Sequence, residues 1–430
     1  MQMAMTLGWH IIAASFGVGL PLLMFLVEWR YLKTGDEGWK TLARRWSKTF
    51  AVLFAVGAVS GTVLSFELGL LWPEFMGTFG GVIALPFTLE GFAFFLEAIF
   101  VGIYLYTWDH LPPRVHWLCA LPIAISGCAS AWFVVTANAW MNVPQGFTLV
   151  DGVVTEADPI VAMLNPATGP QTAHMIIAAY MVTGFMVASY YAWRRLRGDD
   201  TLHHRRAMMA GLVLGAVFAP LQGLSGDWAA TVVAETQPVK LAAMEGQFET
   251  VQGAPLRIGG LPDETRHQTT LAIEIPKMLS WLAYRDFNAE VKGLNAFPEG
   301  DWPPVAVTHL AFQVMVGIGT VLIALSLWAG ISLIRSRRLP ESKLFLWLVA
   351  ASGPLVVIAL EAGWTVTEVG RQPWIVQGYM RTSEAVTRAP GVTGVFFVTM
   401  FIYLVLTVGA VTVLRSLERK PLPEDTARGA

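Results

Sequence analysis

The chain contains nine separate runs of mostly apolar residues, each near the length of about 20 residues that an α-helix needs to cross a bilayer. Only 14% of its 430 residues are charged, whereas soluble domains carry roughly 25%. An all-α polytopic membrane protein is therefore predicted. Its nine transmembrane helices are expected at residues 4–32, 48–71, 84–107, 115–138, 171–194, 207–229, 305–334, 344–364 and 391–414.

The Lys and Arg residues fall unevenly about these runs. Short cytoplasmic loops are enriched in them, whereas long loops are weak indicators of topology. Of the 29 Lys and Arg residues, 20 lie on one side of the predicted membrane, and six of the other nine lie in the long segment 230–304. The 20 are Arg30, Lys33, Lys40, Arg44, Arg45, Lys48, Arg114, Arg194, Arg195, Arg197, Arg205, Arg206, Arg335, Arg337, Arg338, Lys343, Arg415, Arg419, Lys420 and Arg428. This pattern predicts an N-terminus outside and a C-terminus inside.

Three regions follow from this topology. Residues 1–229 would hold the first six transmembrane helices, and residues 230–304 an outer loop that folds into short helices. Residues 305–430 would hold the last three helices and a short cytoplasmic tail. No internal repeat is visible, which weighs against an inverted-repeat transporter. Two cysteines, Cys119 and Cys128, are too few for a disulfide framework, and nothing in the charge distribution indicates binding of nucleic acid.

Five ionisable residues stand within or at the edge of the predicted spans, all toward the outer face. They are His10, Glu90, Glu97, His174 and Glu368. A charged side chain in hydrocarbon costs several kcal/mol, so such residues usually bind a cofactor or carry protons. They are therefore the first candidates for a functional site.

Two of the candidates suit an iron porphyrin. His174 and Met315 approach from different helices, as a six-coordinate haem requires, because neutral imidazole and thioether are both haem-iron ligands. The alternatives are a helix-end histidine that bonds its neighbours and a methionine that only packs. For His10, a ligand role and a satisfied core histidine fit the sequence equally well.

The two carboxyls of the third span form a second pattern. Glu90 and Glu97 are seven residues apart, which returns to within about 20° of the same helix face. Such a pair suits proton relay or contact with a haem, and a structural hydrogen bond to a neighbouring helix is the alternative. His110, His116, His203 and His204 are expected in solvated inner loops and His267 in the outer loop, while His309 is left unassigned.

Several ordered motifs together resemble subunit I of the cytochrome bd-type quinol oxidases, over essentially the whole chain. The motifs are TLGWH at 6–10, LEGFAFFLEAIFVG at 89–102, ANAWMNVP at 137–144, the segment around His174, KLAAME at 240–245 and GWTVTEVGRQPW at 363–374. The resemblance implies a terminal respiratory oxidase of the bacterial inner membrane that oxidises quinol at the outer face and reduces O2 to water. Protons for water would come from the cytoplasm, so a gradient forms without a pump.

The resemblance also implies cofactors and residue roles. The expected cofactors are two b-type haems, one low-spin and one high-spin, and one haem d or a third b-type haem. His174 and Met315 would ligate the low-spin haem, and His10 and Glu368 the two high-spin haems. The residues expected to act in catalysis are Glu90, Glu97, Trp364 and Arg371. A membrane subunit II is the implied partner, with a small single-span subunit as a further family feature.

The outer loop would then bind quinol through Lys240 and Glu245. Five residues along a helix turn through about 140°, so both meet one headgroup only if the helix ends or bends between them. Without the motif, two solvated loop charges would be the better interpretation. The short loop and the spacing of Glu90 and Glu97 resemble the short-loop, cyanide-insensitive branch, and Gln313 stands where many members have arginine.

Two other classes compete with the oxidase. A membrane cytochrome that passes electrons without touching oxygen would explain His174 and Met315, but not His10, the glutamate pair or GRQPW. A proton-coupled transporter would use the glutamates without haem. The sequence leaves open the haem d content, the assignment of the two high-spin ligands, and ubiquinol against menaquinol.

Overall fold

The computed structural model describes residues 1–419. Residues 420–430 of the predicted tail, with the basic residues Lys420 and Arg428, lie outside the described residues. Within the described part, nine helices are long and apolar enough to span a membrane, as predicted. They are α1 (Gln2–Thr34), α2 (Glu37–Leu71), α3 (Pro73–Tyr106), α4 (Pro113–Asn142), α6 (Thr168–Leu196), α7 (Leu202–Thr236), α10 (Val305–Ser336), α11 (Lys343–Val369) and α13 (Val392–Glu418).

These helices are longer than predicted, and polar side chains cap the first turns of three of them, α2, α7 and α11. Asp36 accepts a hydrogen bond from the backbone N–H of Gly38 at the start of α2, and Ser342 accepts one from Phe345 at the start of α11. Such caps satisfy backbone donors that have no partner within the helix. Proline, which is favoured in the first turn, opens α3 and α4.

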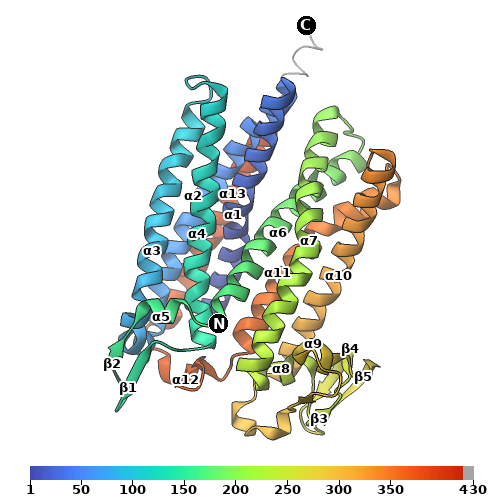
Figure 1. The fold of residues 1–430 in the computed structure, drawn as a ribbon. Coiled ribbons are helices and arrows are strands. Elements are labelled where there is room, and N and C mark those ends of the chain that lie inside the picture. Colours follow the sequence, from blue (N-terminus) through green and yellow to red (C-terminus); the bar gives the residue numbers. More distant parts are fainter. Residues whose placement is uncertain (420–430) are drawn as a thin grey trace.

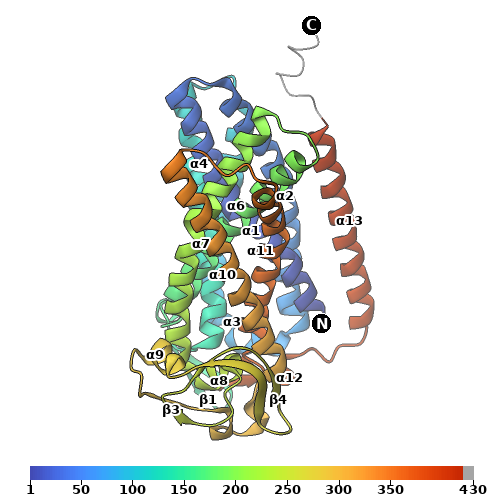
Figure 2. The same cartoon turned by 90° about the vertical axis from the view of Figure 1, so that its right-hand side faces the viewer.

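The helices form one long bundle (Figure 1). Four short connections follow α1, α3, α6 and α10, and the distribution of Lys and Arg predicts that they lie inside. All four are at the end of the bundle opposite the strands (Figure 1). Helices α1 and α6 are the most buried, whereas α13 packs mainly on α2 and stands at the edge (Figure 2). Two hydrogen bonds tie α13 to α1, from Gln2 Nε2 to Thr399 Oγ1 at 3.2 Å and from Trp9 Nε1 to Thr407 Oγ1 at 2.9 Å.

The segments at the other end contain small antiparallel sheets that were not predicted. The strands are β1 (Phe147–Val150), β2 (Val153–Ala157), β3 (Val251–Gln252), β4 (Leu256–Asp263), β5 (Gln268–Ile275), β6 (Glu290–Val291), β7 (Trp374–Val376) and β8 (Met380–Arg381). They pair β1 with β2, β3 with β6, β4 with β5 and β7 with β8. The short helices are α5 (Pro159–Met163), α8 (Pro238–Glu245), α9 (Met278–Tyr284) and α12 (Thr382–Ala385), with 3₁₀ turns at Leu294–Ala296 and Glu299–Asp301.

Candidate functional site

His10 on α1 faces a Ser-Gly pair on α2. Its Nδ1 lies 2.8 Å from the Ser60 hydroxyl, which itself donates to the Gly57 carbonyl at 3.1 Å. With the hydroxyl proton on the Gly57 carbonyl, Nδ1–H donates to Ser60 and Nε2 keeps its lone pair. A Cβ at Gly61 would stand 3.2 Å from the ring carbon Cε1. Glycine thus leaves room beside an imidazole whose Nε2 can bind a metal.

His174 on α6 repeats this arrangement against α7. Its Nδ1 lies 3.0 Å from the Ser225 hydroxyl, which donates to the Gln222 carbonyl at 3.1 Å. The side-chain amide of Gln222 lies 2.9 Å from Nε2, as expected if Nε2 is the acceptor. A Cβ at Gly226 would lie 3.3 Å from Cε1. Metal-ligating histidines commonly donate their other ring N–H in this way, which fixes tautomer and orientation.

Met315 on α10 faces a third glycine, Gly363 on α11, where a Cβ would lie 3.0 Å from the thioether sulfur. Helices α6, α7, α10 and α11 pack in a ring, in which each contacts the next. His174 and Met315 therefore belong to one four-helix group.

The donor set fits haem. Each candidate iron ligand of this set, His10, His174 and Met315, has a glycine beside its donor group, and both imidazoles have Nε2 free of a proton. Among residues 1–419, no three His, Cys, Asp or Glu side chains gather closely enough to hold a metal directly. A porphyrin supplies four ligands itself and needs only one or two from the protein.

The glutamates of α3 face the same half of the bundle. Glu97 is 5% exposed, and its Oε1 has no hydrogen-bond partner among the described residues. It lies between α1 and α4, since a Cβ at Gly127 would stand 3.4 Å from both that oxygen and the Gly17 carbonyl. Glu90 lies beside Ser130 on α4. A buried carboxyl with an unmet acceptor suits the binding and release of protons.

A carboxyl that was not predicted, Glu361, lies on α11 one heptad before Glu368. A Cβ at Gly8 on α1 would stand 3.0 Å from its Oε2, and its Oε1 is buried without a partner within the described chain. The seven-residue spacing repeats that of Glu90 and Glu97 and could have revealed it in the sequence.

Glu368 forms part of a polar chain at the outer end of α11. Arg371 donates to Glu368 Oε2 at 2.7 Å and to Asn138 Oδ1 at 2.7 Å, and it is only 2% exposed. Arg371 thus orients the carboxylate that the sequence predicts as a haem ligand. Trp364 lies on the same helix, half-buried against the main core. The predicted span ended at 364, whereas α11 continues to Val369, so Glu368 lies in its last turn.

Lys240 and Glu245 both lie on α8 and are buried, not solvated. Lys240 donates to Asn142 Oδ1 at 3.0 Å and to the Thr367 carbonyl at 3.1 Å. Burial, with a smaller contribution from Arg371 and against the attraction of Glu368, lowers its pKa to about 7. Because α8 is continuous from Pro238 to Glu245, the two side chains leave the helix in different directions.

Glu245 is 4% exposed, and its Oε2 has no partner among residues 1–419. Burial, opposed by the Arg257 guanidinium, raises the pKa of its carboxyl to about 8. Gln313 accepts from Gly259 N–H at 2.9 Å and donates to the Arg257 carbonyl at 3.0 Å. It therefore binds β4 through neutral hydrogen bonds.

Three histidines predicted in solvated inner loops are instead buried within helices. His116 on α4 is 2% exposed, and its Nδ1 lies 2.7 Å from Glu28 Oε1. His203 and His204 lie in the first turn of α7 and are also buried. For His203 and His204 the prediction was wrong because α7 begins at Leu202, before the predicted span 207–229. His116 is buried because its ring packs against Glu28 on α1. His110 is exposed as expected, and His309 is fully buried on α10.

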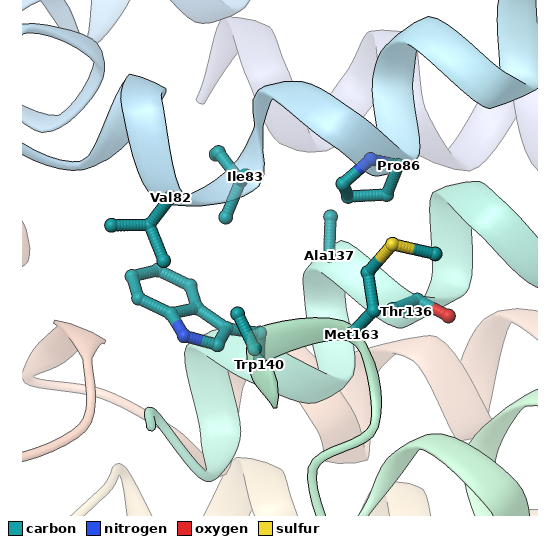
Figure 3. Close-up of a pocket in the computed structure, with 8 residues that line it drawn as sticks. Val82, Ile83, Pro86, Thr136, Ala137, Trp140 and Met163 are labelled. Carbon is teal, nitrogen blue, oxygen red and sulfur yellow. The ribbon is translucent and has the colours of Figure 1, made fainter. Parts of the chain in front are cut away.

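A small apolar recess separates the outer ends of α3 and α4 from α5. Trp140 and Met163 face Val82, Ile83 and Pro86 across it (Figure 3). It is too tight to admit a water molecule. This recess contributes packing and is not a ligand site.

Together, the nine apolar helices of the described residues and the two candidate histidine ligands inside the bundle fit a membrane cytochrome. A model of the cytochrome bd terminal oxidase subunit I family matches residues 1–421. The chain belongs to this family, which confirms the resemblance and the presence of haem as a cofactor.

Similar proteins of known structure or sequence are also bd oxidase subunits. The bd oxidase structure from Geobacillus thermodenitrificans aligns with a TM-score of 0.92 and 42% identity, covering 98% of this chain and 97% of that one. A putative cytochrome bd menaquinol oxidase subunit I of Bacillus subtilis is 39% identical, covering 98% and 96% of the two chains. A cytochrome bd ubiquinol oxidase subunit 1 of the same organism is 32% identical over 96% and 90%. The predicted quinol oxidase is thus confirmed at the level of the family.

Proposed function

We propose that this subunit oxidises quinol at the outer face of a bacterial inner membrane and passes the electrons to haems that reduce O2 to water. The observation that carries the proposal is the repeated Ser-Gly arrangement at His10 and His174. In both, a serine hydroxyl contacts Nδ1 and Nε2 is the nitrogen that would bind iron, although the Gln222 amide contacts Nε2 of His174 here. Family membership favours this oxidase over an electron-transfer anchor or a proton-coupled transporter.

Quinol would bind along segment 230–304, at α8. Lys240 is uncharged about half of the time at pH 7, so it can offer a hydrogen bond to a quinol oxygen without presenting a full buried charge. Glu245 would accept the quinol proton in its ionised form, because its unpartnered Oε2 holds a proton below about pH 8 and loses it above. The two residues would act at opposite ends of one headgroup or in sequence. The same groups suit ubiquinol and menaquinol.

The haem groups supply electron transfer and O2 binding when present. His174 and Met315 would hold the low-spin b-type haem, while His10 and Glu368 would hold the two high-spin haems, a second b-type and a haem d or third b-type. Ser60 and Ser225 fix the two imidazole tautomers, and Arg371 orients the Glu368 carboxylate. Trp364 would lie between the cofactors.

Protons for water would reach the haems through the α3 carboxyls. Glu97 lies deeper in the bundle than Glu90, and its free Oε1 can accept a proton from the inner side and release it outward. The distribution of Lys and Arg supports an N-terminus outside and a C-terminus inside. Release of protons outside and uptake from inside then separates charge without a pump.

The exposed apolar surface of α2, α3 and α13 supports a membrane partner, which the family name identifies as subunit II, with a small single-span subunit as a further expectation. Phe66, Phe92 and Phe401 are each at least 65% exposed there.

The test of the proposed function is quinol-driven O2 uptake by the purified complex in vesicles containing a trapped pH dye. Uptake with internal alkalinisation in oriented vesicles supports the proposal, and quinol oxidation without O2 consumption contradicts it.

A further inference from the structure

Four aliphatic side chains are exposed on the hairpin that β4 and β5 form. Ile258 and Leu261 on β4 are each 50% exposed, and Leu271 and Ile273 on β5 are 84% and 69% exposed. Ile258 lies directly opposite Ile273 in the register, so these two side chains project from the same face. Leu271 has a φ of 59°, which is unusual for a bulky residue. Clusters of exposed apolar side chains typically mark contact with a protein or a membrane.

The other face of the hairpin is polar. Arg257 and Glu274, the neighbouring pair in the register, form an ion pair with Nε and Oε1 3.0 Å apart. Successive residues of a strand point to opposite faces, so this pair lies on the face away from Ile258 and Ile273. Arg257 also donates to Gln247 in the outer loop. The hairpin is therefore amphipathic, with its polar face bound to the rest of the loop.

The hairpin lies beside the membrane-spanning part of α10. Gln313 binds the N–H of Gly259 and the carbonyl of Arg257 on β4. The 23 residues from Gln313 to Ser336, where α10 ends, rise about 35 Å. The hydrocarbon core of a bilayer is about 30 Å thick, and Arg335 places the end of α10 in the inner headgroups. Gln313, and β4 with it, therefore lies at the outer boundary of the hydrocarbon.

Lipid is also the neighbour of the hairpin in the plane of the membrane. The hairpin lies beside α10, on the side of the bundle away from α2 and α3, which belong to the face proposed above for subunit II (Figure 1). Helix α9 packs against β4. Trp281 on α9 stacks on Phe287 with ring centroids 5.9 Å apart, and the two are 36% and 51% exposed. Exposed tryptophan is typical of the membrane–water interface.

We propose that the β4–β5 hairpin rests in the headgroup region of the outer leaflet, with the side chains of Leu271 and Ile273 against the lipid acyl chains. Strand β5 has a strand neighbour on one side only, and the backbone groups of its other side need water. The hairpin therefore lies in the interface and does not cross the membrane. Anchored in this way, the outer loop holds α8 at the depth where a quinol dissolved in lipid arrives. Only this last consequence rests on the function proposed above.

Fluorescence quenching of the purified complex in lipid nanodiscs tests the contact. A bimane label is attached at Ile273→Cys or at Leu271→Cys, in a background with Cys119→Ser and Cys128→Ser that removes the two native thiols of this chain. Doxyl-labelled phospholipid quenches labels that touch acyl chains, and iodide quenches labels in water. Each signal is divided by that of the same preparation without quencher, which cancels quenching by haem. The background without an added cysteine is the blank for labelling of subunit II.

Two reference sites bracket the expected result. Val321 on α10 is 51% exposed, and a label at Val321→Cys should lose fluorescence to doxyl lipid and not to iodide. The Arg266 side chain in the hairpin turn is 74% exposed, and a label at Arg266→Cys should show the reverse. We expect the labels at Leu271→Cys and Ile273→Cys to lose fluorescence to doxyl lipid nearly as the Val321→Cys label does.

Loss of fluorescence to iodide alone would place the hairpin in water and overturn the proposal. Protection from both quenchers would show that a protein covers this face, which would overturn it as well. If one of the two labelled variants does not assemble, the other gives the same readout, and Ile258→Cys on the opposite strand is a third site on this face.

The link to quinol is measured separately in the double variant Leu271→Ser and Ile273→Ser. The KM for a quinol with a long isoprenoid tail should rise several-fold, whereas kcat and the KM for a short-tailed, water-soluble quinol should not change. Doxyl quenching with an unchanged KM would keep the anchor and contradict its role in quinol entry. A complex that oxidises neither quinol would contradict the function proposed above and leave the quenching result to decide on the anchor.

Discussion

His309 and Gln313, one turn apart on α10, together bind both polar backbone groups of Gly259 on β4. His309 Nε2 contacts its carbonyl oxygen at 3.1 Å, and Gln313 Oε1 accepts from its N–H at 2.9 Å. Met315, the expected haem ligand, lies two residues further along the same helix. The outer hairpin is thus fastened to the helix that carries an expected iron ligand.

The glycine beside Met315 gives the first prediction. Gly363→Ala places a Cβ 3.0 Å from the thioether sulfur and should displace it, since overpacking of this kind costs about 1–3 kcal/mol. We expect part of the low-spin haem signal to convert to high-spin, measured by absorption of the reduced enzyme. Gly317→Ala on α10, where a Cβ meets nothing within 4 Å, is the control and should leave the spectrum unchanged.

Ser225 gives the second prediction. Ser225→Ala removes the acceptor for the Nδ1–H of His174, which lowers the basicity of the ring as a ligand. The midpoint potential of the low-spin haem should rise, and haem affinity should fall by about 10- to 100-fold. Redox titration and haem content measure both effects. Ser326→Ala, where a buried hydroxyl bonds only the Leu322 carbonyl, should change neither.

The third prediction concerns proton delivery. Glu97→Gln keeps the volume of the side chain but cannot carry a proton, so steady-state O2 reduction should fall at least tenfold, as for loss of a proton-transfer group. The His174 haem should still be reduced by quinol at the normal rate in stopped-flow measurements. The exposed Glu74→Gln on the same helix is the control. Normal turnover of Glu97→Gln would remove this residue from the path.

The fourth prediction follows from the raised pKa of Glu245, about 8. If its carboxylate accepts the quinol proton, kcat/KM for quinol should rise about tenfold per pH unit below that pKa and level off above it. Glu245→Gln should be slow and lack this step. Stability has the opposite trend, because the buried neutral carboxyl stabilises the fold most below its usual pKa of 4.5 and this contribution is lost as pH rises through about 8. A pH profile of Glu245→Gln that matches the wild type would contradict the assignment.

The nine spans could be predicted because length and hydropathy are local properties of the chain. The helix ends could not, because polar turns extend the helices beyond the apolar runs, as at the start of α2, where Asp36 caps a helix that begins at Glu37 and not at the predicted residue 48. Strands β4 and β5 were missed although QTTLAIEI alternates with the period of a strand. The segment 230–304 around it has mixed charge, which is typical of a loop, and so no strand was predicted there.

The candidate site also has a part that could be predicted from the sequence and a part that could not. Ligand types and their depth in the membrane are visible in single residues, so His10, His174 and Met315 could be proposed. Their partners Ser60, Ser225 and Gly363 come from other helices, and only the packing of the bundle brings them together. The burial of His116 likewise depends on Glu28, 88 residues earlier.

The most direct test of the account is the reduced-minus-oxidised absorption spectrum of the purified complex, recorded for the wild type and for His174→Ala. The account predicts low-spin and high-spin haem signals in the wild type, and selective loss of the low-spin signal in the variant. A wild type without haem, or a low-spin signal that survives in His174→Ala, would contradict it.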